Sequence, residues 1–211
     1  MMLQFLQAYF PHADAKLLAA MADAYPAAKI KYRISVGALC LALGQVKLES
    51  TGLTHLTENL NYSAERLQEV FDMDEGVAEK VAHDPQAIAE LVYGTGHRGK
   101  ELGNETSEDG WTYRGRGPLQ ITGRWMYAAM EAKTGLSLVS NPDAALEPKN
   151  FWTLIFGFFM VKGCMTTLQA PLTQETIEHL TRIINGGLNN LAERLEFTED
   201  AARKLSRFHA A

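Results

Sequence analysis

The sequence predicts a mainly α-helical protein with very little β-strand. Three features support this fold class. Residues 36–48 carry nine apolar side chains that cover almost the whole circumference of a helix, as in a helix buried in a protein core. Residues 151–161 (FWTLIFGFFMV) form a second apolar run of helical length. Capping residues precede most periodic segments, whereas the alternation typical of a strand occurs only at residues 119–122.

Each helix expected in the N-terminal half begins at a capping residue. Asp14 precedes a helix that we expect to end near Pro26, and Ser35 precedes the buried helix, which should stop at residues 50–52. Ser63 precedes a short amphipathic helix whose apolar residues are spaced by three and four.

The C-terminal half is expected to be helical as well, after a glycine-rich break. Asp84 followed by Pro85 is a strong start signal for a helix that runs to residue 93. Residues 94–117 lose all periodicity, and irregular segments of that length are usually functional or disordered. Three further helices are expected at residues 151–161, at about 174–184, and from about 188 towards the C-terminus.

Composition and charge exclude several classes of protein. The chain has 211 residues and a net charge of −5, which is ordinary for a soluble globular protein and gives no sign of nucleic-acid binding. The apolar run at 151–161 is shorter than the ~20 residues of a membrane span, so stable membrane insertion is not expected. The two cysteines lie in apolar helical segments and the six histidines are scattered. We therefore expect no disulfide, no metal site and no cofactor.

Glu49 is the first candidate catalytic residue. It ends the buried helix, where desolvation and the negative end of the helix dipole both favour the protonated form of a carboxyl group. A carboxyl group that stays protonated near neutral pH can act as a general acid. The alternative is a solvated glutamate in the last turn of a helix, which is common for this residue type.

Glu58 is the second candidate. A polar, turn-rich stretch separates it from Glu49 by nine positions. Inverting cleavage of a glycosidic bond requires one acid and one base whose carboxyl groups are about 6.5–9.5 Å apart. The stretch between the two glutamates is long enough to span a cleft of that width. The alternative is a surface glutamate near the start of a helix.

Residues 113–122 (YRGRGPLQIT) are the third candidate segment. Two glycines and a proline force a tight, non-helical backbone, without the spacing of a phosphate-binding loop. The alternation that follows predicts that Gln120 and Thr122 share one face, with Leu119 and Ile121 anchored in the core. An amide beside a hydroxyl suits a sugar and an attacking water. The alternative is a solvated edge strand.

Asn185 and Arg194 complete the set of candidates. Asn185 precedes Gly186, the usual terminator of a helix, so Asn185 is either part of the helix cap or a polar group for a ligand. Arg194 follows two turns later and is either a solvated charge or a partner for a carboxylate in a cleft.

Four sequence blocks together resemble the family 19 glycoside hydrolases, and most closely their phage endolysin branch. They follow one another over about residues 39–195, and ENLNYSA and YRGRGPLQIT are the most telling. The resemblance implies a lysozyme-like, mainly α-helical fold in which two helical lobes flank a substrate cleft. It also implies inverting hydrolysis of a β-1,4 bond in an N-acetylhexosamine polymer. The blocks are LESTG (48–52), TENLNYSA (57–64), YRGRGPLQIT (113–122) and TRIINGG (181–187).

The resemblance also implies roles for individual residues. Glu49 matches the general acid, and Glu58 matches the base that activates water. Thr122 matches a hydroxyl that orients this water, and Arg194 resembles the arginine that steadies the catalytic carboxylate. The substrate-contacting positions of the family correspond to Tyr113, Gln120 and Asn185.

Two positions depart from the family pattern. Leu48 replaces the histidine that normally precedes the catalytic glutamate, which removes a possible hydrogen-bond partner of the acid. Met126 stands where the family often has an asparagine, so one substrate contact of the family lacks its usual side chain here.

The resemblance implies a single catalytic domain over residues 1–211 without a separate wall-binding module. The larger lobe is expected at about 1–57 and 111–211, and the smaller lobe at about 58–110. The expected partner is the glycan strand of bacterial peptidoglycan, bound by a monomer. Because the N-terminus shows no secretory signal, we expect a protein of the host bacterial cytoplasm that reaches the cell wall at lysis, released by a holin as is usual for the family.

Other functions fit the same residues. A lytic transglycosylase also uses an ES-x-G block, here residues 49–52, but needs only one carboxylate. A chitinase would differ in its substrate. A non-catalytic saccharide-binding protein would keep the cleft, although the presence of both carboxylates argues against it.

Overall fold

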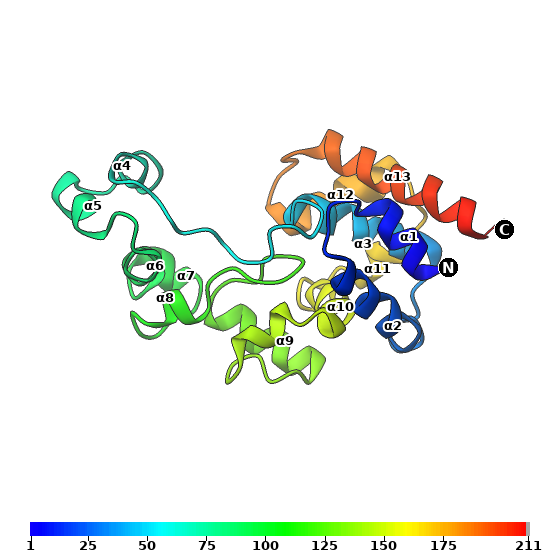
Figure 1. Cartoon of the computed structure of the whole chain (residues 1–211), viewed down its shortest axis with the longest axis horizontal. Coiled ribbons are helices and arrows are strands. Elements are labelled where there is room, and N and C mark those ends of the chain that lie inside the picture. The colour runs from blue at the N-terminus through cyan, green and yellow to red at the C-terminus, as the bar shows by residue number, and fades with distance from the viewer. Residues whose placement is uncertain (210–211) are drawn as a thin grey trace.

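The computed structural model describes residues 1–209 and confirms the mainly α-helical fold class (Figure 1). Within these residues the β pairing is limited to isolated bridges of Arg116 with Thr57 and with Ile121. No helix in this part of the chain combines the length and the apolar composition that crossing a bilayer requires. The helices are α1 (Met2–Tyr9), α2 (Ala15–Tyr32), α3 (Val36–Glu49), α4 (Ala64–Phe71), α5 (Glu75–Val81), α6 (Pro85–Tyr93), α7 (His97–Glu101), α8 (Asp109–Thr112), α9 (Arg124–Thr134), η1 (Pro142–Leu146), η2 (Pro148–Asn150), α10 (Phe151–Val161), α11 (Met165–Leu168), α12 (Gln174–Asn185) and α13 (Leu191–His209).

The helices form two lobes of unequal size (Figure 1). Helices α4–α8 make up the smaller lobe, and the other helices make up the larger lobe. Each lobe has its own hydrophobic core, which in the smaller lobe is built around Leu60, Leu67 and Ile88. The chain crosses between the lobes in an extended segment before α4 and returns between α8 and α9.

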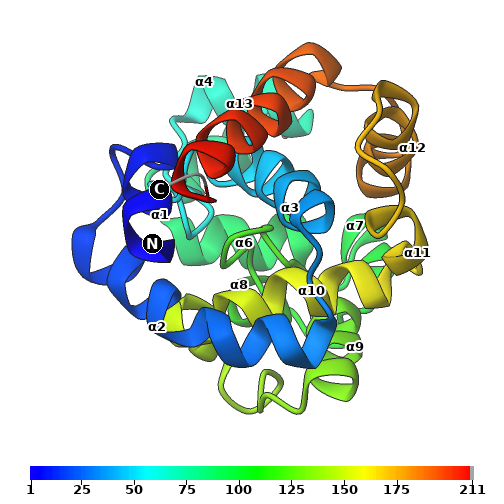
Figure 2. The same cartoon turned by 90° about the vertical axis from the view of Figure 1, so that its right-hand side faces the viewer.

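Helix α3 is the central helix of the larger lobe. Figure 2 shows it between α13 and α10, and its residues from Ala38 to Val46 are all buried. Ser35 caps the helix as predicted, because its Oγ accepts a hydrogen bond of 3.1 Å from the backbone N–H of Ala38. The helix therefore holds its last residue, Glu49, at a fixed place where the core ends.

Other predicted helix starts are also confirmed. The side chains of Asp14, Ser63 and Asp84 each accept a hydrogen bond from a backbone N–H in the first turn of the following helix. The apolar run at 151–161 is α10, most of whose side chains are buried in the larger lobe.

Gly44 allows α13 to lie close against α3. A methyl group at Gly44 would overlap Oγ1 of Thr198 and lie 3.1 Å from its backbone nitrogen. We therefore expect Gly44→Ala to lower the free energy of unfolding by about 1–3 kcal/mol through overpacking, in spite of the better helix propensity of alanine. Chemical denaturation measures the change. Gly37→Ala in the same helix meets no atom closer than 3.9 Å and should be neutral or slightly stabilising. Equal stability of the two variants would contradict this packing.

Two helix boundaries differ from those predicted. Helix α2 continues through Pro26 to Tyr32, although an end near Pro26 was expected. Proline costs a helix one hydrogen bond and some strain. Here Ala28 and Tyr32 beyond the proline are buried, so packing of the second half outweighs that cost. The last helix starts at Leu191 rather than at about residue 188.

The strand expected at residues 119–122 is mostly a turn. The backbone N–H of Gln120 donates to the carbonyl of Gly117 at 3.2 Å, and Gln120 has a left-handed φ of 49° that no strand contains. Leu119 and Ile121 are nevertheless buried as predicted. The alternating pattern was produced by a turn that buries every second residue.

The buried carboxylate of Asp109 fixes the irregular segment at 94–117, which contains α7 and α8. Arg124 at the start of α9 donates two hydrogen bonds of 2.7 Å to it, one to each oxygen. The backbone N–H groups of Glu105 and Thr106 donate to Oδ2. The side chain thus ties α8 to α9 where the chain returns to the larger lobe.

The stability of this connection should depend on pH. Burial alone would raise the pKa of Asp109, but its hydrogen bonds from Arg124 and the backbone lower the pKa from 3.8 to about 2. The stabilisation is thus complete above about pH 4 and is lost as the pH falls to about 2. We expect Asp109→Asn to cost about 3 kcal/mol at neutral pH, and this difference to shrink below about pH 4. Urea denaturation over a pH series measures this difference in the free energy of unfolding between the wild type and the variant. A difference that does not change with pH would show that the ion pair of Asp109 with Arg124 does not contribute to stability.

Candidate active site

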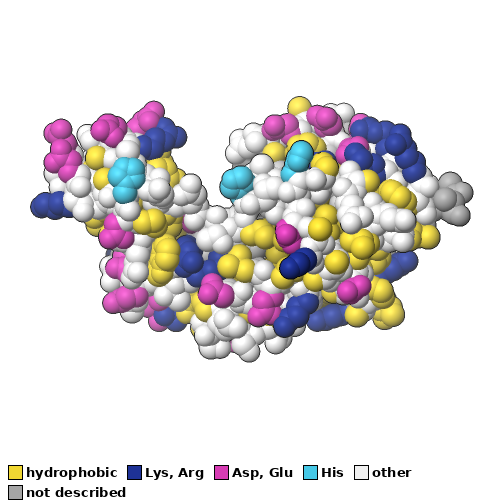
Figure 3. Space-filling model, viewed as in Figure 1, with side chains coloured by type: hydrophobic (Ala, Val, Ile, Leu, Met, Phe, Trp, Pro, Cys, Tyr) yellow, Lys and Arg dark blue, Asp and Glu magenta, His cyan; other side chains and the backbone are white. Residues whose placement is uncertain are grey.

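A hollow lies between the two lobes, and the elements that carry the candidate catalytic residues lie beside it. The space-filling view in Figure 3 shows this hollow on one face of the molecule. The end of α3 and the junction of α12 with α13 belong to the larger lobe beside it, and the two crossing segments connect the lobes beneath it (Figure 1).

Glu49, Asn185 and Arg194 line one polar cavity of about 280 Å³ on the larger lobe. Arg194 is only 2% exposed, and its Nη2 donates to Oε1 of Glu49 at 2.6 Å. Its Nη1 donates to Oε1 of Gln45, one turn earlier in α3, and its Nε donates to the carbonyl of Asn189 at 3.2 Å. Three acceptors therefore fix the guanidinium, and the guanidinium fixes Glu49.

The surroundings of Glu49 are less dry than the sequence predicts. Its side chain is 25% exposed, so it is less desolvated than the end of a buried helix predicts, and it is paired with Arg194, the arginine that the family resemblance assigns to the catalytic carboxylate. The physical reason is that the fully buried stretch of α3 ends at Val46 and the last turn leaves the core. Arg194 engages only Oε1, and within residues 1–209 Oε2 accepts no hydrogen bond, so Oε2 can face a ligand.

A strained turn leads from α3 towards Glu58. Thr51, Gly52 and Leu53 have consecutive left-handed φ values of 47°, 68° and 67°. The buried Ser50 closes the turn, because its Oγ accepts from the backbone N–H of Leu53 at 2.9 Å and donates to a carbonyl of α3 at 2.6 Å. Such conformations cost non-glycine residues about 1–3 kcal/mol and cluster at functional sites.

Glu58, Gln120 and Thr122 converge on Gly115. The N–H of Gly115 donates to Oε2 of Glu58 at 3.2 Å, and the N–H of Glu58 donates to the carbonyl of Gly115 at 2.9 Å. A methyl group on Gly115 would lie 3.0 Å from Oε1 of Gln120 and 3.2 Å from both Cβ of Glu58 and Oγ1 of Thr122. The missing side chain at Gly115 therefore lets three predicted site residues meet around one backbone position.

Tyr93 belongs to this group, although the sequence did not indicate it. Its hydroxyl donates to Oε1 of Glu58 at 2.8 Å. Burial, followed by the negative charge of Glu58, raises the pKa of Tyr93 above its usual value, so the hydroxyl stays a donor. Both oxygens of Glu58 thus accept hydrogen bonds, which suits an ionised carboxylate because that form only accepts.

Tyr113 lies apart from both groups. It is 4% exposed, its ring packs against Tyr127 with centroids 5.2 Å apart, and its hydroxyl donates to the carbonyl of Val139. The side chain is therefore part of the core, and the substrate contact expected of Tyr113 stays a prediction. Met126 is buried as well, so its departure from the family pattern alters the core rather than the cleft.

Comparison with solved structures defines the fold. The chain resembles chitinase C from Streptomyces griseus HUT6037 with a TM-score of 0.58 and 16% identity, covering 96% of this chain and 91% of that one. A mutant of chitinase C gives a TM-score of 0.54 and 18% identity, covering 96% and 75%. The fold is therefore the lysozyme-like, mainly α-helical fold.

Comparison of sequences gives the family. No family model matches the chain. A protein of Haemophilus influenzae, described as a glycosyl hydrolase family 19 domain-containing protein, is 35% identical over 157 residues, which are 72% of this chain and 72% of that protein. The chain belongs to glycosyl hydrolase family 19 and is a glycoside hydrolase. The predicted family is confirmed, and its phage branch stays a prediction.

Proposed function

We propose that the protein hydrolyses β-1,4 glycosidic bonds of bacterial peptidoglycan with inversion. Glu49 donates a proton to the glycosidic oxygen, and Glu58 removes a proton from the attacking water. The observation that carries this proposal is the difference between the two carboxyl groups. Arg194 holds Glu49 by one oxygen, whereas both oxygens of Glu58 accept hydrogen bonds. Carboxyl groups in different environments suit different roles in acid–base catalysis.

Thr122 and Gln120 assist the base. The hydroxyl of Thr122 donates to the carbonyl of Gln120 at 3.0 Å, so its oxygen has lone pairs left to accept from the water that Glu58 activates. The amide nitrogen of Gln120 donates to the carbonyls of His55 and Gly117, which fixes its Oε1 on the side of Gly115.

Asn185 and Arg194 act on the side of the acid. Asn185 lines the cavity of Glu49 and is in a position to bind the sugar whose oxygen is protonated. Arg194 positions Glu49 without contacting the reacting atoms. The likeness of the sequence to the endolysin branch supports peptidoglycan as the substrate. We propose a monomeric endolysin that stays in the host bacterial cytoplasm until a holin releases it to the wall.

Mass spectrometry of digested peptidoglycan tests this function. Hydrolysis adds water to each fragment and leaves an ordinary reducing end, and this is the expected product. A 1,6-anhydro end would contradict hydrolysis and favour a lytic transglycosylase that uses Glu49 alone. Cleavage of chitin oligosaccharides without cleavage of peptidoglycan would favour a chitinase, the activity named for the structurally similar chitinase C.

A further inference from the structure

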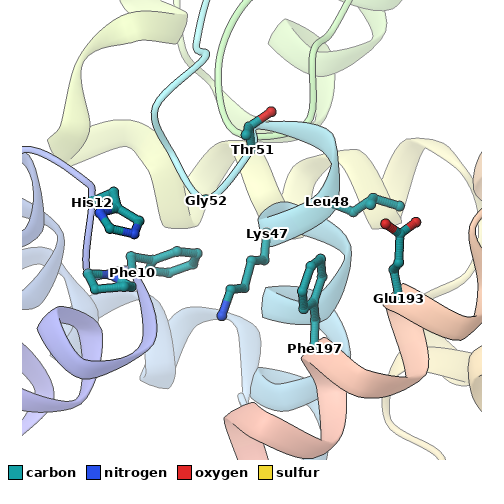
Figure 4. Close-up of a pocket in the computed structure, with 9 residues that line it drawn as sticks. Phe10, His12, Lys47, Leu48, Thr51, Gly52, Glu193 and Phe197 are labelled. Atoms are coloured by element: carbon teal, nitrogen blue, oxygen red, sulfur yellow. The ribbon is translucent and has the colours of Figure 1, made fainter.

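A second cavity borders the candidate active site, and the reaction proposed above does not use it. Its volume is about 460 Å³, and it lies between the turn after α1, the end of α3 and the first turns of α13. Figure 4 shows Phe10 and Phe197 on opposite sides of Lys47, with His12 at one end of the cavity and Glu193 at the other.

The cavity adjoins the Glu49 site through both helices that form that site. Leu48 lines both cavities and separates them. Glu193 directly precedes Arg194 in α13, and successive side chains of a helix point about 100° apart. Arg194 therefore reaches Glu49, whereas Glu193 reaches the rim of the second cavity. A sugar bound at Glu49 has this cavity beside it, across Leu48.

The lining of the cavity combines apolar side chains with Glu193 at one end and His12 at the other, and Phe10 within it is only 1% exposed. The charge of Lys47 is already paired, because its Nζ lies 3.4 Å from Asp200 and 4.2 Å from the ring centroid of Tyr9. Glu193 is exposed and makes no ion pair with any residue in the range 1–209. A ligand that fits would thus present small apolar groups to the partly exposed Leu48 and Phe197 and a cation to Glu193.

We propose that this cavity binds the peptide stem of peptidoglycan, with the stem's ammonium group at Glu193 and its methyl groups against Leu48 and Phe197. The inference rests on the proposed function. Peptide stems branch from alternate sugars of peptidoglycan, and they combine alanine methyl groups with carboxylates and an amine. A glycan without stems has no cation to complement Glu193. The cavity therefore distinguishes peptidoglycan from stem-free glycans such as chitin.

The variant Glu193→Lys tests the inference by reversing the charge of an exposed side chain. Its kcat/KM is measured on intact peptidoglycan and on the same glycan after an amidase has removed the stems. We expect a loss on the order of tenfold on intact peptidoglycan and no loss on the stem-free glycan. Glu193→Gln, which only removes the charge, should lose about threefold on the intact polymer.

Glu199→Lys is the matched control. Glu199 is exposed in the same helix but does not line the cavity, so the same charge change should leave both rates unchanged. Equal losses of Glu193→Lys on both polymers would place Glu193 in the sugar site and overturn the inference. The inference would also be overturned if neither Glu193 variant slowed the hydrolysis of intact peptidoglycan. Failure of the wild-type protein to cleave either polymer would instead overturn the proposed function, and the inference with it.

Discussion

Replacing Glu58 by Gln is expected to lower kcat by about 10²–10⁴-fold, because an amide cannot accept the proton of the attacking water. Glutamine has the same length, and its oxygen can keep one of the two hydrogen bonds that Tyr93 and Gly115 donate to Glu58. The backbone hydrogen bond from Glu58 to Gly115 is untouched. Substrate binding should therefore persist, and KM should change little. Steady-state hydrolysis of peptidoglycan fragments measures both constants.

The same variant distinguishes the two mechanisms that fit the sequence. A transglycosylase needs only the carboxyl group of Glu49 and would keep most of its rate in Glu58→Gln. Tyr93→Phe provides a graded control, since it removes one hydrogen bond to Glu58 and leaves the carboxylate in place. A loss of about tenfold is expected there. A folded Glu58→Gln protein with nearly wild-type kcat would contradict the role of Glu58 as the base.

Replacing Arg194 by Met is expected to reduce both stability and activity. The guanidinium is 2% exposed and binds acceptors on α3 and on the turn before α13, so its removal leaves Gln45 and Glu49 without a donor. We expect a loss of about 3 kcal/mol in the free energy of unfolding, because breaking a buried pair leaves polar groups unpaired. Activity should fall by about 10²-fold, since Glu49 loses the contact that holds it. Denaturant unfolding and kcat of the still-folded variant report the two effects.

Two further variants separate charge from geometry at this position. Arg194→Lys keeps the positive charge but not the planar fork that reaches three acceptors, so its losses should be intermediate. Arg203→Met removes an arginine of the same helix that is 57% exposed and forms long surface ion pairs. Its stability should stay within about 0.5 kcal/mol of the wild type. If Arg194→Met matched Arg203→Met in stability and rate, Arg194 would not position Glu49.

The fold could be predicted where local chemistry decides it. Ser35 caps α3 because a hydroxyl accepts a hydrogen bond from the first turn, and this signal lies within four residues of sequence. The continuation of α2 through Pro26 could not be predicted, because the burial of Ala28 and Tyr32 depends on helices distant in sequence. At Gln120 the sequence predicts a strand where the structure has a turn, because a strand and this turn both bury alternate residues.

The residue types of the site could be predicted, but the partner of Glu58 could not. Family-like blocks indicated Glu49, Glu58 and Thr122, whereas Tyr93 lies 35 positions from Glu58 in a helix of ordinary amphipathic pattern. The contact of Arg194 with Glu49 spans 145 positions, so no local pattern reveals it, and only the family resemblance indicated it. Glu49 is partly exposed because the last turn of α3 leaves the core. The periodicity of the sequence could not show where the helix leaves the core.

The configuration of the first sugar released tests the central claim most directly, namely that Glu49 and Glu58 act as acid and base on a β-1,4 bond. Proton NMR of a digest in its first minutes, before mutarotation, reports the anomer at the new reducing end. Direct attack by water activated at Glu58 predicts the α-anomer. Initial release of the β-anomer, or of a 1,6-anhydro sugar without any reducing end, would contradict it.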